Sequence, residues 1–116
     1  MAEKVRSEYL KYMEQKMVYF ETQSNRLFGR NIRQILLLHS NFLNAEVLGQ
    51  LIDIYRKHGY RFVSIDNALK DKVYDSEISV FKNWGISWLD RWALSQKVPR
   101  DFFKDEPQTP TFINDY

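Results

Sequence analysis

The sequence of 116 residues contains no cysteine, only four glycines, three prolines and two histidines, and no long apolar run. The absence of cysteine excludes disulfide bonds and thiolate metal sites, but it does not distinguish a cytosolic protein from a periplasmic one. No apolar run approaches the roughly 20 residues that a transmembrane helix needs, and the charged, amphipathic residues 1–6 are not typical of a signal peptide. We therefore expect a soluble chain without a membrane span, in a compartment that the sequence leaves open.

Neither sign of charge dominates the chain. Seventeen Lys and Arg residues against 15 Asp and Glu residues leave a net charge of +2, and the two signs are mixed along the sequence. This weak and scattered excess does not predict binding to nucleic acid. With 44% hydrophobic and 16% aromatic residues, the chain has enough apolar material for one folded unit over residues 1–116.

Residues 1–28 predict one long helix, because neither Gly nor Pro occurs before Gly29 and apolar residues recur at spacings of three and four. We expect the helix to cover about residues 3–27 and to end at the turn that begins with Gly29. Its stripe consists of Val5, Tyr9, Tyr12, Met13, Lys16 and Phe20. Such a stripe must pack against another part of the chain or against a partner.

Residues 33–70 predict a βαβ unit followed by a short helix. The apolar run that ends at His39 and the aromatic and β-branched residues 60–65 are typical of two parallel strands. Between them, Asn44 has the chemistry of a helix N-cap, and His58 with Gly59 is typical of a helix C-terminus. Asp66 is expected to cap the short helix that ends near residue 69. The predicted fold class is therefore α/β.

Residues 71–116 predict an irregular and helical tail. After a polar stretch over residues 71–83, three tryptophans fall within nine positions, and Trp88 and Trp92 share one face of a predicted helix. These tryptophans could form a platform for a sugar ring, although their helical spacing also suits packing in a core. The three prolines all follow residue 98, so the last part of the chain is expected to be extended.

His39 is the first candidate for chemistry, because ligands gather at the C-terminal ends of parallel strands. The imidazole group ionises near neutral pH and can donate or accept a proton there. A structural role at the end of a strand is the alternative interpretation of this residue. His58 is interpreted as a structural cation at the C-terminus of a helix, favoured by the helix dipole.

The order of these segments resembles the C-terminal part of the polysaccharide deacetylase family, the NodB-homology carbohydrate esterases. The matching segments are YME at 12–14, YFE at 19–21, QILLLHSNFLNA at 34–45, GYRFVSIDNAL at 59–69 and GISWLDRWA at 85–93. The resemblance implies a partial (β/α) barrel fragment. It also implies that the complete domain holds zinc or another divalent metal and removes acetyl groups from carbohydrate.

Within this resemblance, Leu37 and His39 match the family's Leu-x-His motif. The resemblance implies that Leu37 lines the pocket for the acetyl methyl group and that His39 acts as general acid toward the departing amine or alkoxide. Trp88 is assigned to the substrate pocket. The family's Asp-Asp and His-x-x-x-His motifs, which supply the base and the metal ligands, do not occur in this chain. We therefore expect a C-terminal fragment that holds no metal and is inactive alone.

A different class of function is also open. The apolar stripe of the first helix and the open edges of a two-stranded unit would leave hydrophobic surface uncovered, which usually indicates a partner. On this interpretation the chain is a non-catalytic interaction module that forms a homodimer through its N-terminal helix and binds no acetylated carbohydrate.

Overall fold

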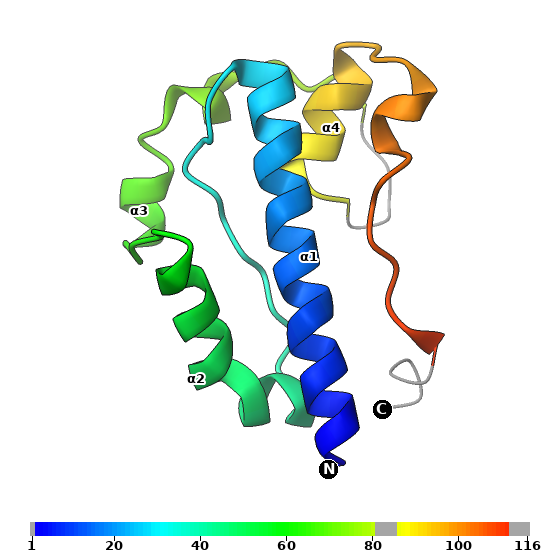
Figure 1. Cartoon of the computed structure of the whole chain (residues 1–116). Coiled ribbons are helices and arrows are strands. Elements are labelled where there is room, and N and C mark those ends of the chain that lie inside the picture. The colour runs from blue at the N-terminus through cyan, green and yellow to red at the C-terminus, as the bar shows by residue number, and fades with distance from the viewer. Residues whose placement is uncertain (1, 81–85, 112–116) are drawn as a thin grey trace. The chain divides into compact units, whose positions relative to one another are not determined.

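The computed structural model describes residues 2–80 and 86–111 (Figure 1). Its elements are the helices α1 (Glu3–Phe28), α2 (Phe42–Lys57), α3 (Ile65–Ala68) and α4 (Trp88–Ser95), with two 3₁₀ helices, η1 (Lys72–Asp75) and η2 (Arg100–Phe103). The chain divides into two compact units: unit 1 comprises residues 1–18, 36–63 and 107–116, and unit 2 comprises residues 19–35 and 64–106. Within the described ranges, no helix combines the length and the apolarity that crossing a membrane requires.

The predicted α/β class, with its βαβ unit and partial (β/α) barrel, is wrong. Residues 33–39 and 60–64 have no regular secondary structure, and residues 2–80 and 86–111 contain no strand. Both segments lack the burial that their apolar composition predicted, because Leu37 is 86% exposed and Phe62 is 50% exposed. The preference of such residues for strands depends on packing against neighbouring strands, and two strands alone form at best a marginal sheet.

The long N-terminal helix is confirmed. The helix also ends at the predicted glycine, because Gly29 has a positive φ of 71° that residues with a Cβ rarely adopt. Ser24, which is completely buried, then fixes the reversal of the chain: its hydroxyl donates to the carbonyl of Arg30 at 2.8 Å and accepts from the N–H of Ile32 at 2.9 Å.

Unit 1 is built on the contact between the first part of α1 and α2. Val5 packs with Leu43 and Val47 in a buried cluster, and Tyr9 and Leu10 cover its edge. Because Val5 contacts the start of α2 and Glu14 of α1 meets His58 at its end, the two helices run in the same direction, as Figure 1 shows. Part of the predicted apolar stripe of α1 is therefore covered within the chain.

The cap of α2 differs from the prediction. The N-cap is Asn41, whose side-chain oxygen accepts from the N–H of Asn44 at 2.8 Å, so Asn44 lies inside the helix. The predicted C-terminus is confirmed, with His58 as C-cap and Gly59 at a φ of 85°. The short helix α3 is confirmed as well, but Ser64 caps it instead of Asp66.

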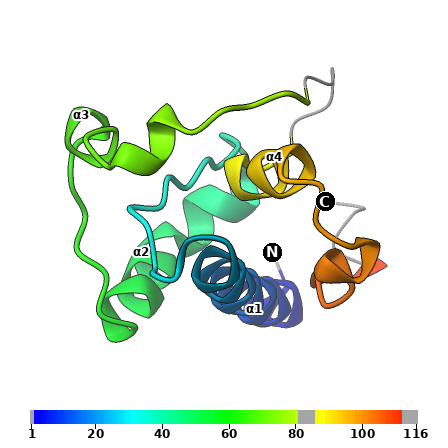
Figure 2. The same cartoon turned by 90° about the horizontal axis from the view of Figure 1, so that it is seen from above.

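Unit 2 has its own core around Trp92 of α4, which is 1% exposed. The indole packs edge-on against Phe28 with ring centres 5.4 Å apart, and it also contacts Tyr74 at 5.5 Å. Figure 2, which views α1 nearly end-on, shows α4 beside the C-terminal end of α1. The buried members of this cluster are Ile32, Val73, Leu89 and Trp92. The tryptophan-rich helix is thus confirmed over residues 88–95, while Trp84 and Gly85 lie outside the described residues.

Asp71 joins two segments of unit 2. Its carboxylate accepts a bidentate pair of hydrogen bonds from the Arg30 guanidinium, at 2.8 and 2.5 Å. It also accepts from the backbone N–H groups of Arg33 and Val73, at 2.9 and 3.0 Å. The carboxylate is almost completely buried, and the Arg30 guanidinium together with the two N–H groups holds its pKa well below the usual value of 3.8.

We expect Asp71→Asn to reduce the free energy of unfolding at neutral pH by about 2 kcal/mol, because the charge-assisted hydrogen bonds are lost. Since the pKa of this group is lower in the folded than in the unfolded chain, its contribution is complete above about pH 4 and disappears as the pH falls further. Urea unfolding between neutral and acidic pH measures both effects. Asp75→Asn, at an exposed position of η1, is the matched control. An equal acid-induced loss in Asp71→Asn and the parent chain would contradict the prediction.

Candidate functional site

The backbone of His39 is held at the start of α2. Its carbonyl accepts hydrogen bonds from the N–H of Asn41 at 3.0 Å and from the side-chain amide of Asn44 at 2.8 Å. Residues 29–40, which lead to the start of α2, have no regular secondary structure. The two hydrogen bonds therefore hold the peptide bond that follows His39. The placement of the His39 backbone therefore depends on the N-terminus of α2 and not on the end of a strand.

His39 is exposed and borders a pocket of about 530 Å³ in unit 1. A volume of this order lies in the range of small-molecule sites. The lining is mainly apolar, with a hydroxyl, two amides and the imidazole as polar groups. The lining residues are Leu38, His39, Ser40, Asn41, Phe42, Asn44, Ala45 and Leu48. This arrangement places a group capable of proton transfer beside a hollow that an uncharged ligand could enter.

The other two predicted site residues do not line this pocket. Leu37, two positions before His39, is 86% exposed and stands outside the lining set. Trp88 belongs to unit 2, where its ring lies 6.1 Å from that of Trp92 and about half of the side chain is exposed. The structure therefore brings neither residue into the pocket that His39 borders.

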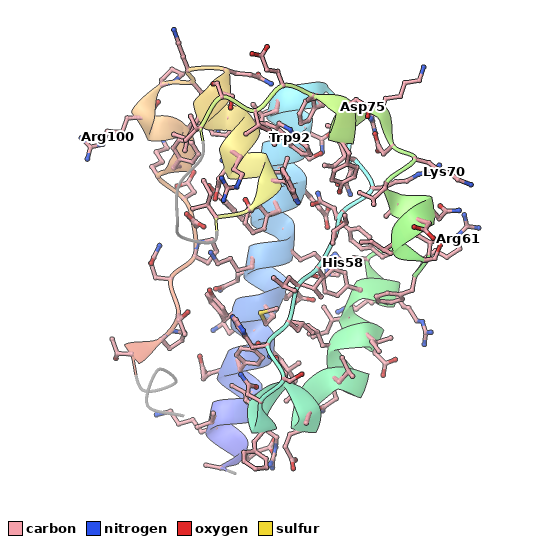
Figure 3. The ribbon with its side chains drawn as sticks, turned by 180° about the vertical axis from the view of Figure 1, so that it is seen from behind. His58, Arg61, Lys70, Asp75, Trp92 and Arg100 are labelled. Carbon is pink, nitrogen blue, oxygen red and sulfur yellow. The ribbon has the colours of Figure 1, made fainter. Side chains whose placement is uncertain are left out.

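His58 lies at the opposite end of α2 from His39. Its imidazole Nε2 is 3.0 Å from a carboxylate oxygen of Glu14, between α2 and α1 (Figure 3). A helix of this length separates the two histidines by about 24 Å. The two imidazoles are too far apart to act on one small ligand or one metal ion.

The described residues do not fit a metal centre. In the part of the chain that the structure describes, no three His, Cys, Asp or Glu side chains lie close enough together to hold a metal ion. A zinc site needs at least three protein ligands.

Two residues of the site were missed by sequence reasoning. The sequence pattern predicts Asn44 as a helix cap and Tyr9 as one member of an apolar stripe. In the structure the Tyr9 hydroxyl donates to the side-chain oxygen of Asn44 at 2.6 Å, so both contribute to the support of His39. The spacing of Asn41 and Asn44 could have indicated a second role for Asn44, because only one of the two residues can be the N-cap of α2.

Comparison with known proteins gives no support for or against the family resemblance, since no family model, no curated protein and no solved structure matches this chain.

Proposed function

We propose that this chain supplies the general acid of a polysaccharide deacetylase-like hydrolase that removes acetyl groups from carbohydrate. The observation that carries the proposal is the exposed imidazole of His39 on the rim of a pocket, with its backbone held by two hydrogen bonds. When the bond between the acetyl carbon and the sugar nitrogen or oxygen breaks, the leaving atom needs a proton. In this proposal His39 donates it.

The supported backbone matters for this role. A general acid must reach the leaving atom within a hydrogen-bond distance, and misplacement of the acid slows proton transfer. With the carbonyl of His39 held, the imidazole can search a smaller region than it could from an unsupported segment. The mainly apolar lining of the pocket suits an uncharged acetyl group.

The proposal assigns the metal and the base to polypeptide outside the described residues. The chain has two histidines and no cysteine, and the histidines lie at opposite ends of α2. Zinc or another divalent ion would activate the attacking water when bound by that other polypeptide. The exposed apolar residues of unit 1 are the surface that such a segment would cover. They are Val18, Leu36, Leu37, Phe42, Leu48, Phe62 and Val63.

The reading frame upstream of the Met1 codon gives the test. If it continues through Asp-Asp and His-x-x-x-His motifs, we expect the complete polypeptide to release acetate from N-acetylated oligosaccharides and a chelator to abolish that release. The chain of 116 residues should release none, because it lacks the motifs that supply the ligands. A stop codon directly before Met1, or acetate release by this chain that a chelator does not affect, would contradict the proposal.

The second candidate is a non-catalytic interaction module, favoured by the same exposed apolar residues. Leu37 and Phe42 are 86% and 87% exposed, more than any other large hydrophobic residue described. Val5 of the N-terminal helix is instead buried against α2, so the apolar residues free for pairing lie mainly in residues 36–48 and 62–63. Burial of such residues in a homodimer would be favourable by about 25 cal/mol per Å².

Sedimentation velocity across a wide concentration range separates the two candidates. A homodimer that dissociates on dilution and that Leu37→Asp weakens would support the interaction module. A monomer at every concentration would exclude self-association and leave the deacetylase proposal as the better account. Lys57→Gln, on the exposed C-terminal turn of α2, lowers the net charge by the same single unit and serves as the control.

A further inference from the structure

We infer that Asn44 is a positioning residue for His39, held in place by Tyr9. The inference rests on the proposed function for its catalytic consequence, because it deepens the account of the same site. The hydrogen bonds that carry it do not depend on any activity.

A chain of hydrogen bonds runs from α1 to His39. The Tyr9 hydroxyl donates to Asn44 Oδ1 at 2.6 Å, and Asn44 Nδ2 donates to the His39 carbonyl at 2.8 Å. Burial raises the pKa of the Tyr9 hydroxyl above its ordinary value, which keeps it protonated and able to donate. Asn44 is 8% exposed, so its amide exchanges few hydrogen bonds with water.

The geometry differs from that of an ordinary helix start. At the third position of a helix, a polar side chain commonly reaches back to the N–H of the N-cap residue, which completes a capping box. Here the N–H of Asn41 donates to the His39 carbonyl instead, and the Asn44 amide donates to that same carbonyl. Asn44 therefore supports a residue that lies two positions before the cap, and the start of the helix alone does not require that contact.

Asparagine is also an unusual choice for a position inside a helix. Asparagine is among the weaker helix formers, and burying its amide is unfavourable unless its groups are paired. An alanine would suit the interior of α2 better if helix formation were the only requirement. Asn44 also lines the pocket, so the group that holds the backbone of His39 lies beside the space where a ligand would bind. Misplacement of a catalytic group by about 1 Å costs up to about 100-fold in rate.

The first experiment uses the 116-residue chain itself and requires no activity. Asn44→Asp keeps an oxygen for the Tyr9 hydroxyl but replaces the donor to His39 by an acceptor. The N–H of Ser40 shares a peptide plane with the His39 carbonyl, so we expect the ¹⁵N order parameter of the Ser40 amide to fall from about 0.85 to below about 0.6 while the values in the middle of α2 stay unchanged. Tyr9→Phe should lower it in the same direction, whereas Tyr12→Phe, outside the hydrogen-bond chain, should not. Unchanged order at the Ser40 amide in Asn44→Asp or, if that variant does not fold, in Tyr9→Phe overturns the inference.

The second experiment uses the complete polypeptide. Asn44→Asp is expected to lower kcat by about tenfold or more with KM within about twofold, because the ligand still binds but the acid is misplaced. If Asn44 only stabilised the fold, Asn44→Asp would reduce the fraction of active molecules, and those molecules would keep the kcat and KM of the parent protein. If His39→Gln is fully active, the proposed function fails, and lost order at the Ser40 amide in Asn44→Asp still supports the positioning role. If His39→Gln is inactive and Asn44→Asp keeps full kcat, the inference fails and the proposed function stands.

Discussion

Replacement of His39 by glutamine in the complete polypeptide is expected to lower kcat for acetylated carbohydrate by about 10²- to 10⁴-fold. Glutamine keeps a side chain of similar length that can form hydrogen bonds, but it cannot transfer a proton to the leaving atom. The carbonyl of residue 39 should still accept from Asn41 and Asn44, so the local backbone is kept. Rates of acetate release at saturating substrate measure the effect.

A change of leaving group tests the role itself. 4-Nitrophenyl acetate releases a phenolate that needs no proton, so His39→Gln should lose far less activity on this ester than on carbohydrate. His58→Gln is the matched control, since this second histidine contacts Glu14 at the far end of α2. Equal losses on both substrates, or equal losses in the two variants, would show that His39 does not act as a general acid.

Trp92→Ala is expected to reduce the free energy of unfolding by about 3–5 kcal/mol. The indole is 1% exposed and contacts the rings of Phe28, Tyr74 and Trp88, so its removal leaves a large cavity in the core of unit 2. Figure 3 shows Trp92 among the side chains between α4 and the C-terminal half of α1. Urea unfolding followed by near-ultraviolet circular dichroism measures the loss.

Trp88→Ala provides the comparison within the same helix. About half of this side chain is exposed, so the variant should lose only about 1 kcal/mol. Titration with an N-acetylated oligosaccharide then decides between the two interpretations of Trp88. Weakened binding at nearly unchanged stability would indicate a sugar platform, and unchanged binding would indicate packing alone. Equal destabilisation by both alanine variants would contradict the burial that distinguishes the two tryptophans.

The elements that the sequence predicted correctly depend on local signals. The long α1 follows from the absence of Gly and Pro before Gly29, and the end of α2 follows from His58 and Gly59. The short α4 follows from apolar residues at helical spacing. Such signals act within a few residues and need no distant partner.

The predicted strands failed because strand formation is a non-local property. Residues 33–39 and 60–65 have apolar and β-branched composition, but a strand also requires a neighbour in the correct register. The structure has no strand in the described residues, and Leu37 and Phe62 are exposed. A local pattern could not reveal whether such a neighbour exists.

The candidate site was predicted in part. His39 was selected because it would end a strand; that reason was wrong, yet the residue does border a pocket. The support from Asn44 and Tyr9 could not be predicted, because these two residues are 35 positions apart and their contact depends on how α1 packs against α2. The cap at Asn41 was within reach of the sequence, since an asparagine three positions earlier offered the same chemistry.

One helix belongs to both units: residues 3–18 of α1 contribute to unit 1, and residues 19–28 contribute to unit 2. Because helix formation is cooperative along the chain, order in one half favours order in the other. Each hydrophobic cluster therefore stabilises a segment that the other cluster needs. For folding, α1 is a shared thermodynamic element, and the two units are expected to lose structure as coupled parts instead of as independent modules.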